Sequence, residues 1–147
     1  SEDILNNEMF DVSLNDLADL PEFKPFKEGA HKALVNLKAK KIGEHPAIEL
    51  SMKLVQTLEL SNTAETPDEP GCETSVAYML DNPYGQGALK LVIAPICQRL
   101  GIDMNVKGFL RTVVDQCKDM ECLIVSNVRK GKEEGQVFMN VKQLQVI

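Results

Sequence analysis

The stretch ALVNLKAKKIGEHPAIELSMKLV, residues 33–55, has the alternation of two antiparallel strands joined by a short turn at Gly43. Successive side chains of a strand point to opposite faces of the sheet, and here every second side chain is aliphatic. The aliphatic set is Val35, Leu37 and Ala39 before the turn, then Ile48, Leu50, Met52 and Leu54 after it. The pattern predicts a long β-hairpin with one buried face.

The opposite face of this hairpin is polar and rich in lysine. It carries Lys32, Asn36, Lys38 and Lys40 on the first strand, then Glu49, Ser51 and Lys53 on the second. Two interpretations of these lysines stay open. They form a solvated surface, or they form a basic surface for the phosphates of a nucleic acid.

Length and composition predict one domain with an ordinary core, because a chain of 147 residues buries enough apolar surface to fold without disulfide bonds or structural metals. Four cysteines, at 72, 97, 117 and 122, include no CxxC pair and occur with only two histidines. We therefore expect reduced, buried thiols, with no metal site and no cofactor. No apolar run approaches the ~20 residues of a membrane span, so we expect a cytoplasmic protein without a membrane partner.

The net charge of −6 is unevenly distributed along the chain. Residues 1–23 hold seven acidic side chains and no basic ones, and residues 58–73 hold five more acidic side chains in a loop-like composition. Without these two segments, 16 basic residues remain against 10 acidic ones. The charges predict an acidic N-terminal arm, residues 1–23, attached to a mildly basic domain, residues 24–147.

The acidic arm also carries apolar residues at a spacing that fits one or two short amphipathic turns. These residues are Met9, Phe10, Val12, Leu14, Leu17 and Leu20. The arm has two functional interpretations: its carboxylates imitate phosphates and cover a basic groove, or its apolar residues dock on a replication or recombination protein. A solubilising tail without a partner is the third.

Further along the chain, the pattern predicts strands at 29–42, 46–60 and 73–81, followed by a turn at DNPYGQG. Residues 88–102 have helical spacing that Pro95 should kink or divide, and Gly101 should end this helix. A second amphipathic helix is expected from a cap at Asp103 or Asn105, with an apolar face. That face holds Val106, Phe109, Leu110, Val113, Val114 and Cys117. Residues 121–130 and 136–147 predict a closing hairpin.

Five strands with a helical insertion between the third and the fourth have the connectivity of an OB-fold, a small and partly open Greek-key barrel. We therefore expect a mainly β protein with a five-stranded OB-like barrel. An open barrel that ends in a strand leaves an edge, which self-association would cover. The number of subunits in such a homo-oligomer is not fixed by the pattern.

Three segments, FKPFKEGAHKALV, IGEHPAIELSMKLV and YMLDNPYGQGALKLVIAPICQRLGI, resemble the single-stranded DNA-binding proteins of bacteriophage replication modules, which are small OB-fold proteins. The resemblance covers most of residues 24–147. It implies a non-enzymatic protein that coats single-stranded DNA during phage DNA replication or recombination, in the cytoplasm of the host cell.

Binding single strands without sequence preference needs cations for the phosphates and aromatic faces for the bases. The expected nucleic-acid-binding residues are Lys32, Lys38, Lys40, Lys53, Tyr78, Tyr84, Arg129, Lys130, Lys132, Phe138 and Lys142. Core packing is the alternative for Tyr78 and Phe138, and His31 is expected to pack in the core. No set of residues has the spacing of a catalytic site.

The alternative function is a non-enzymatic β-barrel adaptor or a virion-associated protein. Such a protein would bind other proteins through its acidic arm and its sheet edges, and the lysines would be merely solvated. The charge of the strand face separates the two functions. It should be continuously positive in a DNA-binding protein and mixed in an adaptor.

Overall fold

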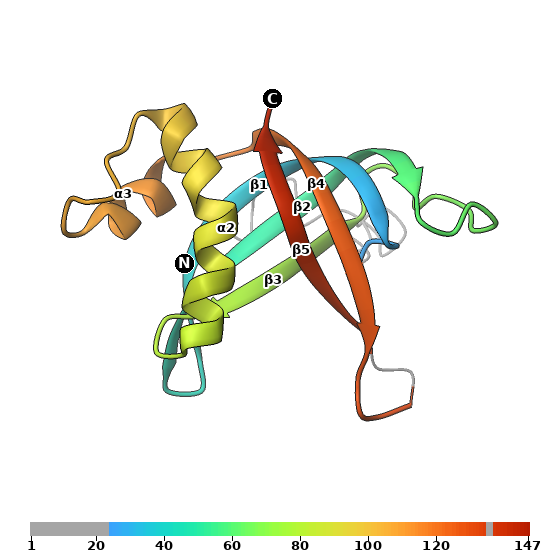
Figure 1. Ribbon diagram of the computed structural model, residues 1–147, viewed down its shortest axis with the longest axis horizontal. Coiled ribbons are helices and arrows are strands. Elements are labelled where there is room, and N and C mark those ends of the chain that lie inside the picture. The colour runs from blue at the N-terminus through green and yellow to red at the C-terminus, as the bar shows by residue number, and fades with distance from the viewer. Residues whose placement is uncertain (1–23, 135–136) are drawn as a thin grey trace, which may run out of the picture.

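The computed structural model describes residues 24–134 and 137–147. It contains β1 (Gly29–Ile42), β2 (His45–Leu60), β3 (Glu73–Met79), α2 (Pro83–Leu100), α3 (Phe109–Gln116), β4 (Met120–Lys130) and β5 (Val137–Val146), arranged as Figure 1 shows. The expected acidic arm, residues 1–23, lies outside the described residues.

The five strands form one antiparallel sheet in the order β3-β2-β1-β4-β5. The prediction of a mainly β protein with helices between the third and fourth strands is therefore confirmed. β1 pairs with β2 along its whole length and with β4 only from Gly29 to Val35. Among the described residues no ladder joins the edge strands β3 and β5, so the sheet is not closed and a barrel is not confirmed.

The β1–β2 hairpin has the predicted register. Val35 lies opposite Met52 and Leu37 lies opposite Leu50, and all four side chains are buried. Ala39 was expected on the same buried face, but it is exposed. The reason is that β1 no longer pairs with β4 beyond Val35, whereas Ile48, opposite Ala39, stays buried because β2 still pairs with β3 there.

Gly29 allows the start of β1 to approach the end of β2 closely. A Cβ atom at this position would lie 2.1 Å from the Glu59 carbonyl oxygen, and its φ of +154° also disfavours other residues. Register shifts follow directly, between Ala30 and His31 and between Lys32 and Ala33. The extra residue lies on β2 at each shift, Leu58 at the first and Val55 at the second, so the bulges bend β2 and increase its twist against β1.

The helices differ from the expected ones at their N-termini. α2 begins at Pro83, within the segment expected to be a turn, because the Asn82 side chain accepts hydrogen bonds from the first free backbone N–H groups. Pro95 lies inside α2 and does not divide it. α3 begins at Phe109 after Gly108, so the predicted cap at Asp103 or Asn105 is wrong.

The core lies between the concave side of the sheet and α2, which packs on β5 and β3, while α3 packs on β1 (Figure 1). Its largest fully buried side chains include Phe26, Leu37, Leu50, Met52, Leu54, Ile96 and Ile124. His31 and the four cysteines are buried, as predicted, and the cysteines are free thiols. Within the described residues, no helix combines the length and the apolar character needed to cross a membrane.

Candidate nucleic-acid interface

The outer face of β1, β2 and β3 holds the lysines that the sequence singled out, and it is mixed in charge. A shallow groove of about 380 Å³ crosses this face. Its charged residues are Lys38, Lys53, Glu49, Glu73 and Asp119. In the strand register Lys38 lies opposite Glu49, and Lys53 lies opposite both Leu34 and Glu73. This face therefore has alternating signs instead of a continuous positive potential.

Two of the predicted lysines form ion pairs on or beside this face. Lys32 Nζ lies 2.6 Å from Glu121 Oε1 on β4, and Lys40 Nζ lies 2.7 Å from Glu49 Oε2 on β2. A phosphate would have to compete with these carboxylates. Neighbouring strands therefore supply acids beside Lys32 and Lys40, so these two lysines do not form one continuous basic surface with Lys38 and Lys53, and their role in nucleic-acid binding stays a prediction.

Asp119 is a part of this face that sequence reasoning missed. The Asn36 amide donates a hydrogen bond of 3.0 Å to the Asp119 carboxylate, and the Asp119 backbone N–H donates one of 3.0 Å to the Asn36 amide oxygen. These two hydrogen bonds hold Asp119, whose φ of 46° lies in the left-handed region, just before β4 begins. Because these residues are 83 positions apart, no local pattern indicates their contact.

A second groove, of about 470 Å³, lies between the edge strands β3 and β5. β3 contributes Thr74, Ser75, Val76 and Ala77, and β5 contributes Val137, Phe138, Met139 and Asn140. The charged residues that line it are Lys24 and Arg129, and its described lining includes no carboxylate. We call this the β3–β5 groove. It differs from the outer face of β1 and β2 in that its described lining holds no carboxylate and in having an aromatic wall.

Arg129 and Phe138 form the wall of the β3–β5 groove. They are partners in the β4–β5 register, and the Arg129 guanidinium carbon lies 5.4 Å from the centroid of the Phe138 ring. This distance is typical of a cation–π contact, which holds the guanidinium against the ring. Phe138 is 41% exposed, so the pair presents a flat apolar surface and a positive charge to solvent.

Lys24 is held at the other side of the β3–β5 groove. Its backbone N–H donates a hydrogen bond to the Glu73 carbonyl at the start of β3, and its ammonium lies 3.3 Å from the Asp68 carboxylate. Asp68 also lies 3.9 Å from the Lys27 ammonium and accepts a hydrogen bond from the Lys27 backbone N–H. This acid belongs to the loop predicted to be an exposed acidic appendage, yet its side chain is only 2% exposed. The loop is therefore anchored at Asp68.

Tyr78 is not available as a stacking residue, and this prediction is wrong. Its side chain points into the core with 5% of the residue exposed, and its hydroxyl has no hydrogen-bond partner among the described residues. Burial raises the pKa of Tyr78 well above its usual range. The alternation of β3 placed Tyr78 on the face of Thr74 and Val76, and of these Thr74 is also buried while Val76 is partly buried against the core.

Tyr84 is 89% exposed at the start of α2, beside the β1–β2 hairpin. A contact of 2.6 Å between His45 Nδ1 and Asp81 Oδ2 joins the end of this hairpin to the β3–α2 connection. Tyr84 therefore offers a second exposed ring, separate from the β3–β5 groove.

The other predicted cations lie at or near the β4–β5 hairpin. Lys130 and Lys132 are exposed at its turn. Lys142 is exposed on β5, on the side that also presents Phe138 and Asn140, as their alternation predicts. Of the predicted cations only Arg129 lines the β3–β5 groove; Lys130 and Lys132 lie beyond Val137 at the turn, and Lys142 lies beyond Asn140 on β5. Sequence reasoning missed Lys24, Ser75 and Ala77 in this groove.

No group of three or more His, Cys, Asp or Glu side chains in the described ranges is placed to hold a metal ion. No protein-family model matches this chain, and no curated protein matches its sequence.

Proposed function

We propose that this protein binds single-stranded DNA without catalysis, along the β3–β5 groove. The observation that carries the proposal is the stacked pair of Arg129 and Phe138, exposed on the wall of a groove with basic charge. Single-stranded nucleic acids need cations for their phosphates and flat apolar surfaces for their bases, and this pair offers both within one contact.

The proposed architecture is a partly open, OB-like barrel. β1 is shared between two halves of the sheet, the order is β3-β2-β1-β4-β5, and the helices are inserted between β3 and β4. In an OB-fold, oligonucleotides bind on the face of strands 2 and 3 and at the β1–β2 and β4–β5 loops. Here the β3–β5 groove occupies the position of the open seam.

The two hairpin ends support a path for the strand. In Figure 1 the β1–β2 turn and the β4–β5 turn project from the same, lower side of the molecule, and β3 runs between them. The first hairpin carries exposed Lys38 and Lys41, together with Lys40, which is paired to Glu49, and with Glu44 in its turn. The second carries exposed Lys130 and Lys132 beside Glu133 and Glu134. A strand that follows the groove would therefore meet cations at both ends, with Tyr84 beside the first hairpin.

The floor of the groove favours contact between bases and the backbone of β3. Ser75 and Ala77 present small side chains there, and Asn140 adds an amide that donates and accepts hydrogen bonds. Small side chains let a nucleotide approach the strand, and neutral ones avoid repelling phosphates. The resemblance to phage proteins assigns this binding to DNA replication or recombination.

The experiment is fluorescence anisotropy of a labelled oligo-dT titrated with the full chain, from low to physiological salt, with a matching duplex and oligo-U as competitors. The proposal expects saturable binding that weakens as salt rises, survives duplex competition and is stronger than binding to oligo-U. No binding at low salt, or equal displacement by duplex, would reject it.

The mixed outer face of β1 and β2 favours a second candidate, a protein-binding adaptor. The ion pairs Lys32–Glu121 and Lys40–Glu49 reduce the attraction of this face for phosphates, while the edges of β3 and β5, which pair with no further strand in the described part of the chain, can accept an added one. A chain that binds no oligonucleotide but forms a stable complex with a partner protein in the same buffer would support the adaptor.

A further inference from the structure

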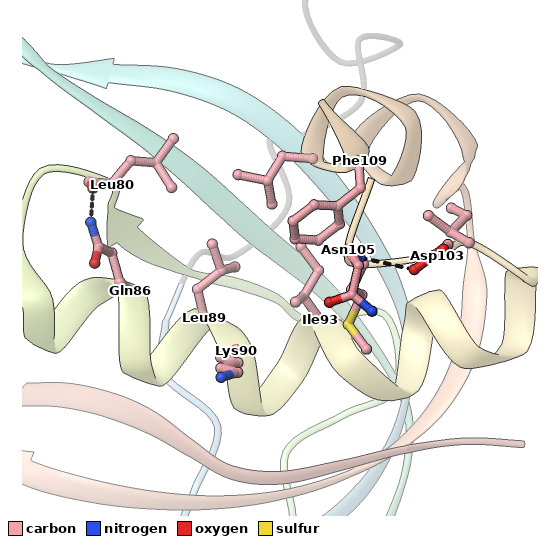
Figure 2. A pocket seen from close by; sticks show the side chains of 11 residues that line it. Leu80, Gln86, Leu89, Lys90, Ile93, Asp103, Asn105 and Phe109 are labelled. Carbon is pink, nitrogen blue, oxygen red and sulfur yellow. Dashed lines mark hydrogen bonds between the residues drawn. The ribbon is translucent and has the colours of Figure 1, made fainter. Parts of the chain in front are cut away.

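A second hollow, of about 680 Å³, lies between α2, α3 and the end of β3, away from the proposed DNA site. Figure 2 shows four apolar side chains that converge on it: Leu80 after β3, Leu89 and Ile93 on α2, and Phe109 on α3. We call it the α2–α3 groove. It shares no lining residue with the β3–β5 groove.

The α2–α3 groove is apolar inside and polar at its rim. Leu89 and Ile93 are buried at its floor, whereas Leu80 and Phe109 are only partly buried. Gln86 and Lys90 lie along its edge, and Gln86 donates a hydrogen bond to the Leu80 carbonyl across one end (Figure 2). Apolar side chains that fill a hollow of this size and character lower the free energy, because apolar surface on both sides is removed from water.

We propose that the N-terminal arm of the same chain, residues 1–23, occupies the α2–α3 groove. The first reason is apolar content. The arm carries Met9, Phe10, Val12, Leu14, Leu17 and Leu20 among its acidic residues. The β3–β5 groove offers these side chains less, because Thr74, Ser75 and Asn140 make its lining more polar.

The second reason is charge. The helical part of the chain, residues 83–118, contains five basic residues and two acidic ones. The groove itself is lined by one cation, Lys90, and one carboxylate, Asp103. The positive excess comes from residues around it, such as Lys107 and Arg111, which flank Phe109 in the sequence. The arm contains seven acidic residues and no basic ones, so it complements this surface better than it complements the mixed outer face of β1 and β2.

The third reason is reach. The arm joins the domain at Lys24, which is hydrogen-bonded to Glu73 at the start of β3, and the groove lies at the other end of that strand, beside Leu80. A seven-residue strand spans roughly 23 Å, whereas 23 extended residues reach roughly 75 Å. The arm therefore has enough length to run along β3 and enter the groove from its own chain.

Site-specific photocrosslinking of the full chain tests this inference. A benzophenone amino acid replaces Phe10, the protein is irradiated without nucleic acid, and the crosslinked peptides are identified by mass spectrometry. The inference expects adducts with residues 80–93 or 102–110 within single chains, at a yield that does not depend on protein concentration. Adducts only between chains, adducts on the β3–β5 groove, or none would overturn it.

Hydrogen exchange provides the second readout with matched variants. Leu14→Asp with Leu17→Asp adds two negative charges and removes two apolar side chains, whereas Asn6→Asp with Asn15→Asp adds the same charge and removes none. The first variant should raise amide exchange in residues 102–110 several-fold, and the second should leave it near wild type. Equal effects would overturn the inference. Neither experiment uses DNA, so both outcomes are independent of the proposed function.

Discussion

Arg129 and Phe138 face each other across the β4–β5 pair, with the guanidinium carbon 5.4 Å from the ring centroid and the ring 41% exposed. The ring lies at the seam between the edge strands β3 and β5, in a described lining that holds Lys24 and Arg129 and no carboxylate. The pair holds its cation and its ring in one orientation, so a nucleotide that binds there would order little further structure.

Replacing Phe138 tests the stacking role. Phe138→Ala should weaken binding to oligo-dT by roughly 5- to 100-fold, since one stacked base contributes about 1–3 kcal/mol. Phe138→Tyr keeps the flat ring and should bind nearly as wild type. Leu91→Ala, which removes a 62% exposed side chain on α2, is the control and should change nothing. Anisotropy titration measures all four proteins, and equal losses for Phe138→Ala and Leu91→Ala would contradict the role.

Arg129 and the paired lysines should differ in their salt dependence. Arg129→Gln removes a cation of the groove and should lower the slope of log Kd against log salt by about 0.7, the value for one phosphate on a single strand. Lys40→Gln removes a charge already paired with Glu49, so its slope should change less. Titrations at several salt concentrations measure both slopes. If Lys40→Gln has the larger effect, the strand follows the outer face of β1 and β2 instead.

The sheet was largely predictable, because strand patterns are local. Val35, Leu37, Leu50 and Met52 repeat every second position, and this period alone sets both the register and the buried face of the hairpin. The helix starts were harder to predict. The start of α2 depends on the Asn82 side chain, which outweighed the turn-like composition of the residues after it.

The candidate site was less predictable, because it depends on contacts between distant residues. Alternation shows that Lys32 shares a face with Lys38, but not that Glu121 from β4 pairs with it. Alternation likewise does not decide which face of β3 is buried. Only the packing of α2 on β3 shows that the Tyr78 ring belongs to the core. The β3–β5 groove joins the third and fifth strands, whose approach no local pattern encodes.

Asp68 should stabilise the fold more than its neighbours in the same loop. Its carboxylate is buried between the Lys24 and Lys27 ammonium groups and accepts the Lys27 backbone N–H. Asp68→Asn leaves these groups poorly paired and should lower the free energy of unfolding by about 1–3 kcal/mol, less than for a fully buried pair, since both lysines are partly exposed. Urea denaturation measures the change. Glu69→Gln, at an exposed position, is the matched control, and an equal loss there would refute the anchoring role.

His31 makes the stability depend on pH. It is fully buried, its Nε2 donates a hydrogen bond of 2.6 Å to the Lys27 carbonyl, and its Nδ1 accepts one of 3.0 Å from the Thr57 hydroxyl. Burial lowers the pKa of His31 below its ordinary value of 6.5, against smaller raising effects from the Lys27 carbonyl and the Asp68 charge. The neutral imidazole is therefore the form that the fold prefers.

The sign of the pH effect follows from this direction. As the pH falls below about 6.5, the unfolded chain binds the proton more readily than the folded chain, so the free energy of unfolding decreases. The stability that the neutral His31 side chain contributes to the fold is fully present above that pH and is lost as the pH falls below it. Urea denaturation at about pH 7.5 and about pH 5.5 should show a smaller pH-dependent loss in His31→Gln than in wild type. A loss of the same size in both proteins would show that other groups cause it.

The cysteines should be unreactive in the folded protein. All four are buried, and burial raises the pKa of Cys117 to about 11 and that of Cys122 to about 12. The thiolate is the reactive form, so a thiol reagent at about pH 8 should modify the native chain slowly and all four cysteines rapidly in urea. Leu91→Cys adds an exposed thiol on α2 and should react at once, which shows that the reagent is active. Rapid modification of a wild-type cysteine would mean that the region around it opens faster than this packing allows.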